Sequence, residues 1–204
     1  MMNVILQSVY AGNVNYYAAL LKADEVLIDV NEHFLKQSYR NRCVIAGANG
    51  PLNLIVSVKR KTGRVKLKDV EIDYSENWQK IHWKSIESAY RTSPYFEFYE
   101  DKFKLLYASK EINLLMDWNF AIHQAILNCL KHEVKQQKTE KYFSDIDGYE
   151  DLRSEIHPKK QITSHYKVNT YLQVFDDRMD FLPNISVLDL LFNEGPAASQ
   201  WLLR

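Results

Sequence analysis

The sequence predicts an α/β fold in which one mixed sheet joins a parallel strand–helix–strand unit to an antiparallel meander, with several helices packed around it. Apolar runs over residues 3–9 and 25–30 flank a helical segment over residues 14–22, which is the order of a parallel crossover unit. Residues 43–58 contain two strand-like runs around a hairpin turn, and helical periodicity dominates residues 76–131. The 204 residues suit a single domain over residues 1–204.

The parallel unit begins with a short apolar run that is typical of a buried strand. A turn from Tyr10 to Asn13 follows, and Asn13 is a suitable N-cap for the next helix. The run Glu-Val-Leu-Ile-Asp-Val over residues 25–30 predicts the second strand.

The antiparallel part contains two turn signals. Asn49-Gly50 predicts a tight hairpin between the strands over residues 43–46 and 52–58. A second turn over residues 61–64 leads into residues 65–72, where apolar residues alternate with lysines and predict a third strand. We expect this meander to join the parallel unit in one sheet.

Helices follow the meander. Helical spacing predicts a helix over residues 76–90, ended by Ser93-Pro94, a short helix over residues 101–108 and a long helix over residues 111–131. Residues 136–158 are polar and match no element, and residues 171–175 resemble a final strand. The pattern Ser186-x-x-Asp189 predicts a capped helix over residues 186–193.

Composition excludes several classes of partner. Lys plus Arg equals Asp plus Glu at 26 each, so the chain has no overall field that would attract nucleic acid. No apolar run is long enough to span a membrane, and the N-terminus does not resemble a secretion signal. Cys43 and Cys129 are expected in the core, and a reducing, cytoplasmic location fits them. No metal or cofactor motif occurs, so we expect neither.

The loop over residues 31–42 is the most informative stretch for function. Ligands of α/β sheets bind beyond the carboxyl ends of parallel strands, where this loop and the turn from Tyr10 to Asn13 should meet. Arg40 and Arg42 would point the same way in an extended segment and could bind a phosphate or carboxylate. The alternative is a solvated loop whose charges pair with one another. The candidate ligand-binding residues of this region are Tyr10, Asn13, Lys36, Tyr39, Arg40, Asn41 and Arg42, with Glu32 as a candidate base.

An aromatic cluster forms a second candidate region. Trp78 and His82 lie four residues apart on one helix face, so His82 could act as a base beside an aromatic wall, and Trp78 or Trp83 could flank a sugar ring. The alternative is that Trp78 is a core residue and His82 a hydrogen-bonded residue at its rim. The basic run over residues 59–68 reads as a charged sheet edge that resists strand addition, with phosphate binding as the alternative.

Several blocks resemble the WbqC-like family and span most of the chain in the expected order. They are Lys36-Gln-Ser-Tyr39-Arg40-Asn41-Arg42, Trp78 with His82, Ala89-Tyr90, Ser93-Pro94-Tyr95-Phe96, and Ile185-Ser186-Val-Leu-Asp189-Leu-Leu-Phe192-Asn193-Glu-Gly195. Family members often carry a His-Pro or Gln-Pro pair after the first strand, whereas Gln7 is followed here by Ser8 and Val9.

The resemblance implies a role in polysaccharide biosynthesis, because family members occur with O-antigen and other surface-polysaccharide genes. It implies acyl or aminoacyl transfer, such as glycyl transfer, to a nucleotide-linked or lipid-linked sugar. We therefore expect a transferase that acts on an activated sugar. The alternatives are a non-catalytic component that binds polysaccharide-biosynthesis enzymes, and a nucleotide-handling α/β enzyme.

Overall fold

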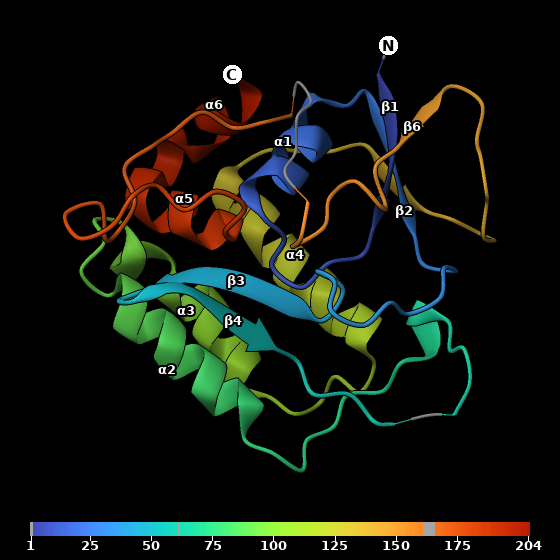
Figure 1. Ribbon diagram of the computed structural model, residues 1–204, viewed down its shortest axis with the longest axis horizontal. Helices are drawn as coiled ribbons and strands as arrows, with labels where there is room; N and C mark the ends of the chain where they lie inside the picture. The colour runs from blue at the N-terminus through green and yellow to red at the C-terminus, as the bar shows by residue number, and fades with distance from the viewer. Residues whose placement is uncertain (1, 61, 161–165) are drawn as a thin grey trace.

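The computed structural model describes residues 2–60, 62–160 and 166–204, and two sheets and a group of helices share its core (Figure 1). The strands are β1 (Asn3–Gln7), β2 (Glu25–Asp29), β3 (Arg42–Gly47), β4 (Gly50–Ile55), β5 (Gln136–Lys138) and β6 (Tyr149–Asp151). The α-helices are α1 (Val14–Lys22), α2 (Trp78–Tyr90), α3 (Phe96–Ala108), α4 (Leu115–Leu130), α5 (Val187–Glu194) and α6 (Ala198–Leu203). Two 3-10 turns, η1 (Leu67–Asp69) and η2 (Gly195–Ala197), complete the elements. The predicted α/β class is confirmed.

The parallel sheet has the strand order β5-β2-β1-β6, and each pair within it is parallel. Val4 and Leu6 of β1 and Val26 of β2 are fully buried, so the two central strands form part of the core. The predicted strand–helix–strand unit is confirmed, because α1 connects β1 to β2. The edge strands β5 and β6 lie in the stretch that matched no element, since each is short and carries almost no apolar side chains.

The hairpin forms its own antiparallel sheet rather than an extension of the parallel one. β3 pairs with β4 from Arg42↔Ile55 to Gly47↔Gly50, and the Asn49-Gly50 turn is confirmed by a φ of 120° at Gly50. The expected third strand over residues 65–72 is wrong. Its apolar residues Leu67 and Val70 enter the core through η1, and only isolated bridges remain at its two ends. Residue 61 of the predicted second turn lies outside the described residues.

The helices differ from the prediction mainly at their starts. The helix predicted over residues 101–108 begins at Phe96, because Phe96, Tyr99, Phe103 and Tyr107 form one buried stripe at helical spacing. α4 begins four residues later than predicted. The residues before it pair with the segment after η1, where Ile72 N–H donates to Asn113 O (2.8 Å) and Leu115 N–H donates to Val70 O (2.9 Å).

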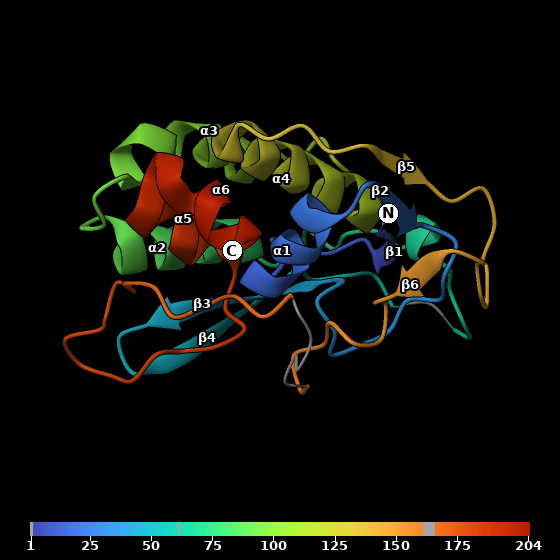
Figure 2. The same ribbon diagram turned by 90° about the horizontal axis from the view of Figure 1, so that it is seen from above.

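The C-terminal segment wraps along the hairpin before α5 enters the core (Figure 2). The strand predicted over residues 171–175 is wrong, because the side chain of Gln173 takes the place of a strand partner. Its Oε1 accepts from Leu182 N (2.7 Å) and its Nε2 donates to Leu182 O (3.1 Å), which closes a loop. Ser186 caps α5 by accepting from Leu188 N, as expected of an N-cap.

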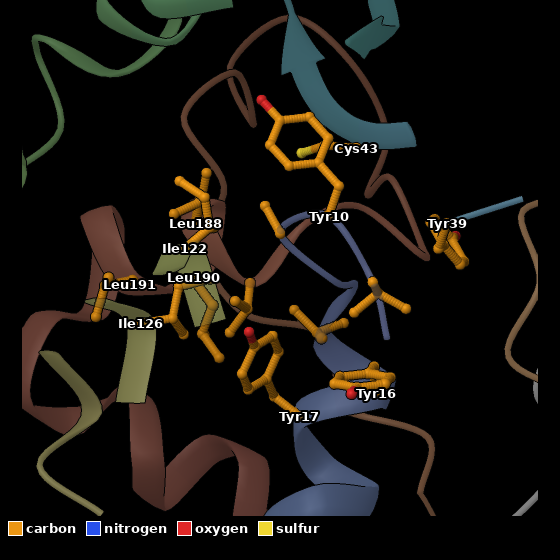
Figure 3. Close-up of a cluster of buried hydrophobic side chains, with 14 of the residues drawn as sticks. Tyr10, Tyr16, Tyr17, Tyr39, Cys43, Ile122, Ile126, Leu188, Leu190 and Leu191 are labelled. Carbon is orange, nitrogen blue, oxygen red and sulfur yellow. The ribbon is translucent and has the colours of Figure 1, made fainter. Parts of the chain in front are cut away.

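The reciprocal half of the predicted capping box does not form. The Ser186 N–H donates instead to Val44 O at 2.7 Å. The Asp189 carboxylate is fully buried and points away from the helix start, toward side chains of other elements. A cluster of apolar and aromatic side chains from the Tyr10 turn, α1, α4 and α5 surrounds this part of the core (Figure 3).

Gly195 at the end of α5 allows a prediction about stability. Its φ is 52°, and an added Cβ would lie 2.4 Å from the Tyr95 ring. Gly195→Ala is therefore expected to lower the free energy of unfolding by about 2–4 kcal/mol, from backbone strain plus overpacking. Urea denaturation measures this loss. Gly148→Ala is the control, because its φ is also positive (79°) but no atom would contact the new Cβ. An equal loss in both variants would contradict the proposed clash.

Candidate functional site

The carboxyl edge of the parallel sheet carries a buried network of polar side chains. Asp29, at the end of β2, accepts from Arg153 Nη1 (2.5 Å), Thr139 Oγ1 (3.1 Å) and the Asn31 N–H (2.9 Å). Arg153 also donates through Nε to Asp151 at the end of β6 (2.9 Å). The network joins the ends of three strands, so these charges fix the sheet edge on which the following loops rest.

Glu32 and Arg40 form an ion pair within the loop over residues 31–42. Arg40 Nε donates to Glu32 Oε1 at 2.7 Å, and Nη2 donates to Glu32 Oε2. The two side chains are only 8% and 5% exposed. Burial raises the pKa of Glu32, and the Arg40 guanidinium partly offsets this rise. Both charges are therefore engaged with each other inside the loop.

The rest of the loop is tied to the hairpin and to α4. The Asn41 side chain donates to Val56 O at 3.0 Å, and the Val56 N–H donates back to Asn41 O at 2.9 Å. Asn119 of α4 donates from Nδ2 to Arg40 O at 2.8 Å. These hydrogen bonds to the hairpin and to α4 fix the conformation of the loop.

The loop also meets the turn before α1. The Tyr10 N–H donates to Tyr39 O at 2.8 Å, and Asn13 Nδ2 donates to the Tyr39 hydroxyl at 3.4 Å. Asn13 Oδ1 accepts from Tyr16 N at 2.9 Å, which makes Asn13 the N-cap of α1, as predicted. The contact between loop and turn is buried, and Tyr10, Asn13 and Tyr39 are each at most 2% exposed.

Trp78 and His82 lie in an aromatic part of the core. The Tyr10 hydroxyl is 3.0 Å from His82 Nδ1 and also contacts the Tyr107 hydroxyl at 2.5 Å. The Trp78 and His82 rings lie 5.1 Å apart. Burial lowers the pKa of His82 to about 4, so its imidazole is neutral at physiological pH. His82 is therefore held by packing, by the Tyr10 hydroxyl and by a hydrogen bond to the Ile55 backbone.

A hollow opens on the outer side of the loop, and we call it the basic hollow. Its volume is about 480 Å³, and its lining is Phe34, Lys36, Val58, Lys59, Arg60, Gly63, Arg64, Val65 and Val70. The loop and the basic run enclose it because Phe34 N–H donates to Val65 O (2.8 Å) and Leu67 N–H donates to Glu32 O (2.8 Å). The basic run thus folds across the loop instead of forming a sheet edge.

The remaining predicted site residues lie elsewhere. Arg42 starts β3, and its Nε is buried with no hydrogen-bond partner within the described chain. It is close enough to His157 to help lower the pKa of that imidazole, although burial, Arg40, Lys159 and Lys160 lower it more. Trp83 lines a separate depression of about 370 Å³ beside Tyr107. Only Lys36 of the predicted set lines the basic hollow, so the expected residues do not converge on one cavity.

Arg60 and Arg64 line the basic hollow and belong to the basic run, for which the sequence favoured a charged sheet edge and gave phosphate binding only as the alternative. Sequence reasoning missed the Asp29–Arg153 network, because Arg153 follows an edge strand that has no apolar signature. Within residues 2–60, 62–160 and 166–204, no group of three or more His, Cys, Asp or Glu side chains is arranged to hold a metal ion. None of the helices in those ranges is long and apolar enough to cross a membrane.

Comparison with known proteins supports the family blocks that lie within residues 7–144, whereas the block from Ile185 to Gly195 lies beyond that match. The chain is 26% identical to "Uncharacterized protein Rv1507c" of Mycobacterium tuberculosis in an alignment 226 positions long, which covers 97% of this chain and 96% of that protein. No solved structure shows significant similarity. The model of the WbqC-like protein family matches residues 7–144, which include the loop, the hairpin, the basic hollow and the aromatic cluster. The chain therefore belongs to the WbqC-like protein family.

Proposed function

We propose that this chain binds a phosphate-bearing activated sugar, such as a nucleotide sugar, in the basic hollow. We propose further that it acts as an acyl or aminoacyl transferase in bacterial surface-polysaccharide biosynthesis. The observation that carries the binding step is a hollow of about 480 Å³ with four basic side chains around it. The transfer step rests on the family to which the chain belongs.

The charges of the basic hollow favour an anion. Lys59 is paired with Glu71 at 2.9 Å, whereas Lys36, Arg60 and Arg64 form no ion pair with any other described residue. Guanidinium groups bind phosphate oxygens through two parallel hydrogen bonds, and lysine supplies a mobile point charge. Three cations without a paired carboxylate therefore suit a diphosphate better than a single carboxylate.

The apolar lining of the hollow suits the organic part of such a ligand. Phe34, Val58, Val65 and Val70 provide the apolar part of the lining, beside the basic side chains. The volume lies within the usual range for small-molecule sites, which combine apolar walls with a few polar groups. A base or a sugar ring could rest on this apolar lining while the phosphates face the basic side chains.

The Glu32–Arg40 pair has a supporting role in this proposal. It holds the loop that carries Phe34 and Lys36, and the contacts that hold Glu32 and Arg40 are internal to the fold. Proton acceptance by Glu32 would require that pair to open, and His82 is enclosed by Tyr10 and Trp78. We therefore assign Glu32 and His82 to structural roles, and no ligand contact to Arg42, which does not line the hollow.

Calorimetric titration with UDP-glucose tests the binding step. Lys36→Ala/Arg64→Ala should weaken binding by at least about tenfold, because each phosphate contact is charge-assisted. Binding to the unaltered chain should also weaken with added salt. Lys66→Ala/Lys84→Ala is the matched control, since it removes two exposed basic residues that do not line the hollow.

Two results would contradict the binding step. One is the absence of binding by the unaltered chain to UDP-glucose and to other nucleotide sugars. The other is equal weakening in the control variant. Binding without turnover of any acyl or aminoacyl donor would instead indicate the non-catalytic alternative, a component that holds the sugar for polysaccharide-biosynthesis enzymes.

A further inference from the structure

A second hollow is lined by Ala46 of β3 and by residues of the segment that precedes α5. This segment runs beside the hairpin in Figure 2. We call this second hollow the acidic hollow. Its volume is about 250 Å³, and the charged side chains that line it are Asp176 and Asp180. No lysine, arginine or histidine within the described chain lines it. The acidic hollow thus has the opposite charge to the basic hollow.

Aromatic rings form much of its wall. Tyr171, Phe175 and Phe181 line the hollow, and Tyr171 and Phe181 meet edge to face with ring centroids 5.4 Å apart. The faces of aromatic rings carry negative partial charge and attract ammonium groups. The rings therefore favour a cation independently of the two carboxylates.

A buried carboxylate lies directly behind this wall. Asp189 of α5 is fully buried, and neither of its oxygens forms a hydrogen bond of standard geometry with a described residue. The Tyr171 hydroxyl, the Tyr90 hydroxyl, the Val174 N–H and the Gln173 side chain lie around it, near enough to lower its pKa but not enough to offset burial. Tyr171 and Gln173 also line the hollow, so these two side chains separate Asp189 from it.

An unpaired carboxylate in the core is energetically costly unless a cation or hydrogen-bond donor compensates it. The main groups that lower the pKa of Asp189 are hydrogen-bond donors, namely Tyr171, Tyr90, the Val174 amide and Gln173, and they offset the cost of burial only in part. A cation in the acidic hollow would supply this compensation across one side-chain layer. The same cation would meet Asp176 and Asp180 at the rim.

We propose that the acidic hollow binds a small ligand that carries a primary ammonium group on a hydroxylated ring, the class of the amino sugars. The ammonium would lie over the aromatic wall near Asp176 and Asp180, and the ring hydroxyls would face Thr170, which also lines the hollow. A volume of about 250 Å³ is below the usual range for drug-sized ligands, so one small ring fills it. This site does not depend on the proposed function of the basic hollow.

Calorimetric titration with glucosamine tests this proposal, with glucose as the uncharged comparison. The unaltered chain should bind glucosamine at least about tenfold more tightly than glucose, because only the amine gains the ionic and cation–π terms. Asp176→Asn/Asp180→Asn should remove most of that preference while leaving the fold intact, because both side chains are exposed. Asp189→Asn should weaken glucosamine binding without changing the affinity for UDP-glucose.

The matched control is Asp177→Asn/Asp147→Asn, which removes two exposed carboxylates that do not line the hollow. It should retain the preference for glucosamine. Equal affinity for glucose and glucosamine, no binding of either sugar, or an equal loss in the control would each overturn the proposal. Because UDP-glucose binding reports on the basic hollow alone, failure of one site is distinguishable from failure of the other.

Discussion

Replacing Asp189 with Asn should raise the free energy of unfolding near pH 8 by about 2–4 kcal/mol. Burial raises the pKa of Asp189 to about 7 in the folded chain, from an ordinary value of 3.8. Between these two values the folded chain binds more protons than the unfolded chain, so stability falls as pH rises from about 4 to about 7. Above pH 7 the full penalty of a buried anion is present. Asparagine has nearly the same shape and carries no charge, so it avoids that penalty.

Urea denaturation of both proteins at several pH values between about 5 and 8 measures this effect. The advantage of Asp189→Asn should shrink as pH falls, because the carboxyl group of the unaltered chain then becomes protonated. Other carboxyl groups titrate in both proteins and cancel in the difference. A constant difference across this range would show that Asp189 does not change protonation there. A stabilised variant that also binds glucosamine poorly would show that this carboxylate is retained at the expense of stability.

Glu32→Ala should destabilise the chain by about 3–5 kcal/mol, because it leaves the buried Arg40 guanidinium without its partner. The reverse change, Arg40→Ala, should have an effect of similar size. Replacing the pair together, as Glu32→Leu/Arg40→Met, should cost much less than the sum of the single changes, because no buried charge is left unpaired. A double-mutant cycle of urea denaturation curves gives these three values.

The control for this cycle is the exposed pair Lys59 and Glu71, whose side chains are 57% and 37% exposed. Removal of one partner there should change stability by less than about 1 kcal/mol. If Glu32→Ala were no more destabilising than Glu71→Ala, the loop would not depend on its ion pair. A separate measurement of UDP-glucose binding by Glu32→Leu/Arg40→Met would show whether the loop keeps its shape when apolar side chains replace the ion pair.

The sequence predicted those parts of the fold whose signals are local. The strand–helix–strand unit and the Asn49-Gly50 hairpin each follow from residues within one short segment. β5 and β6 could not be found in this way, because they are polar and their partners lie far along the chain. The strand predicted over residues 171–175 failed for a related reason, since the Gln173 side chain satisfies the backbone of Leu182 and removes the need for a strand partner.

The sequence predicted where the polar loop of the candidate site lies, but not the direction in which each of its side chains points. The polar loop does lie beyond the carboxyl end of β2, and it does contact the Tyr10–Asn13 turn. Its side chains, however, divide between the two sides of the loop: Arg40 turns inward to Glu32, and Lys36 turns outward to the basic hollow. Which way each side chain turns depends on tertiary neighbours such as Asn119 and Val65, which no local pattern reveals.

The strand order of the parallel sheet also bears on how the chain folds. β1 and β2 are synthesised first, yet both of their outer neighbours come from residues 136–151. Until that part of the chain is available, two apolar strands have open backbone edges, an arrangement that favours pairing with other chains. Such distant pairing raises contact order and slows folding compared with a helical bundle of equal size. The short, polar edge strands that complete the sheet are therefore also what protects its apolar centre from aggregation.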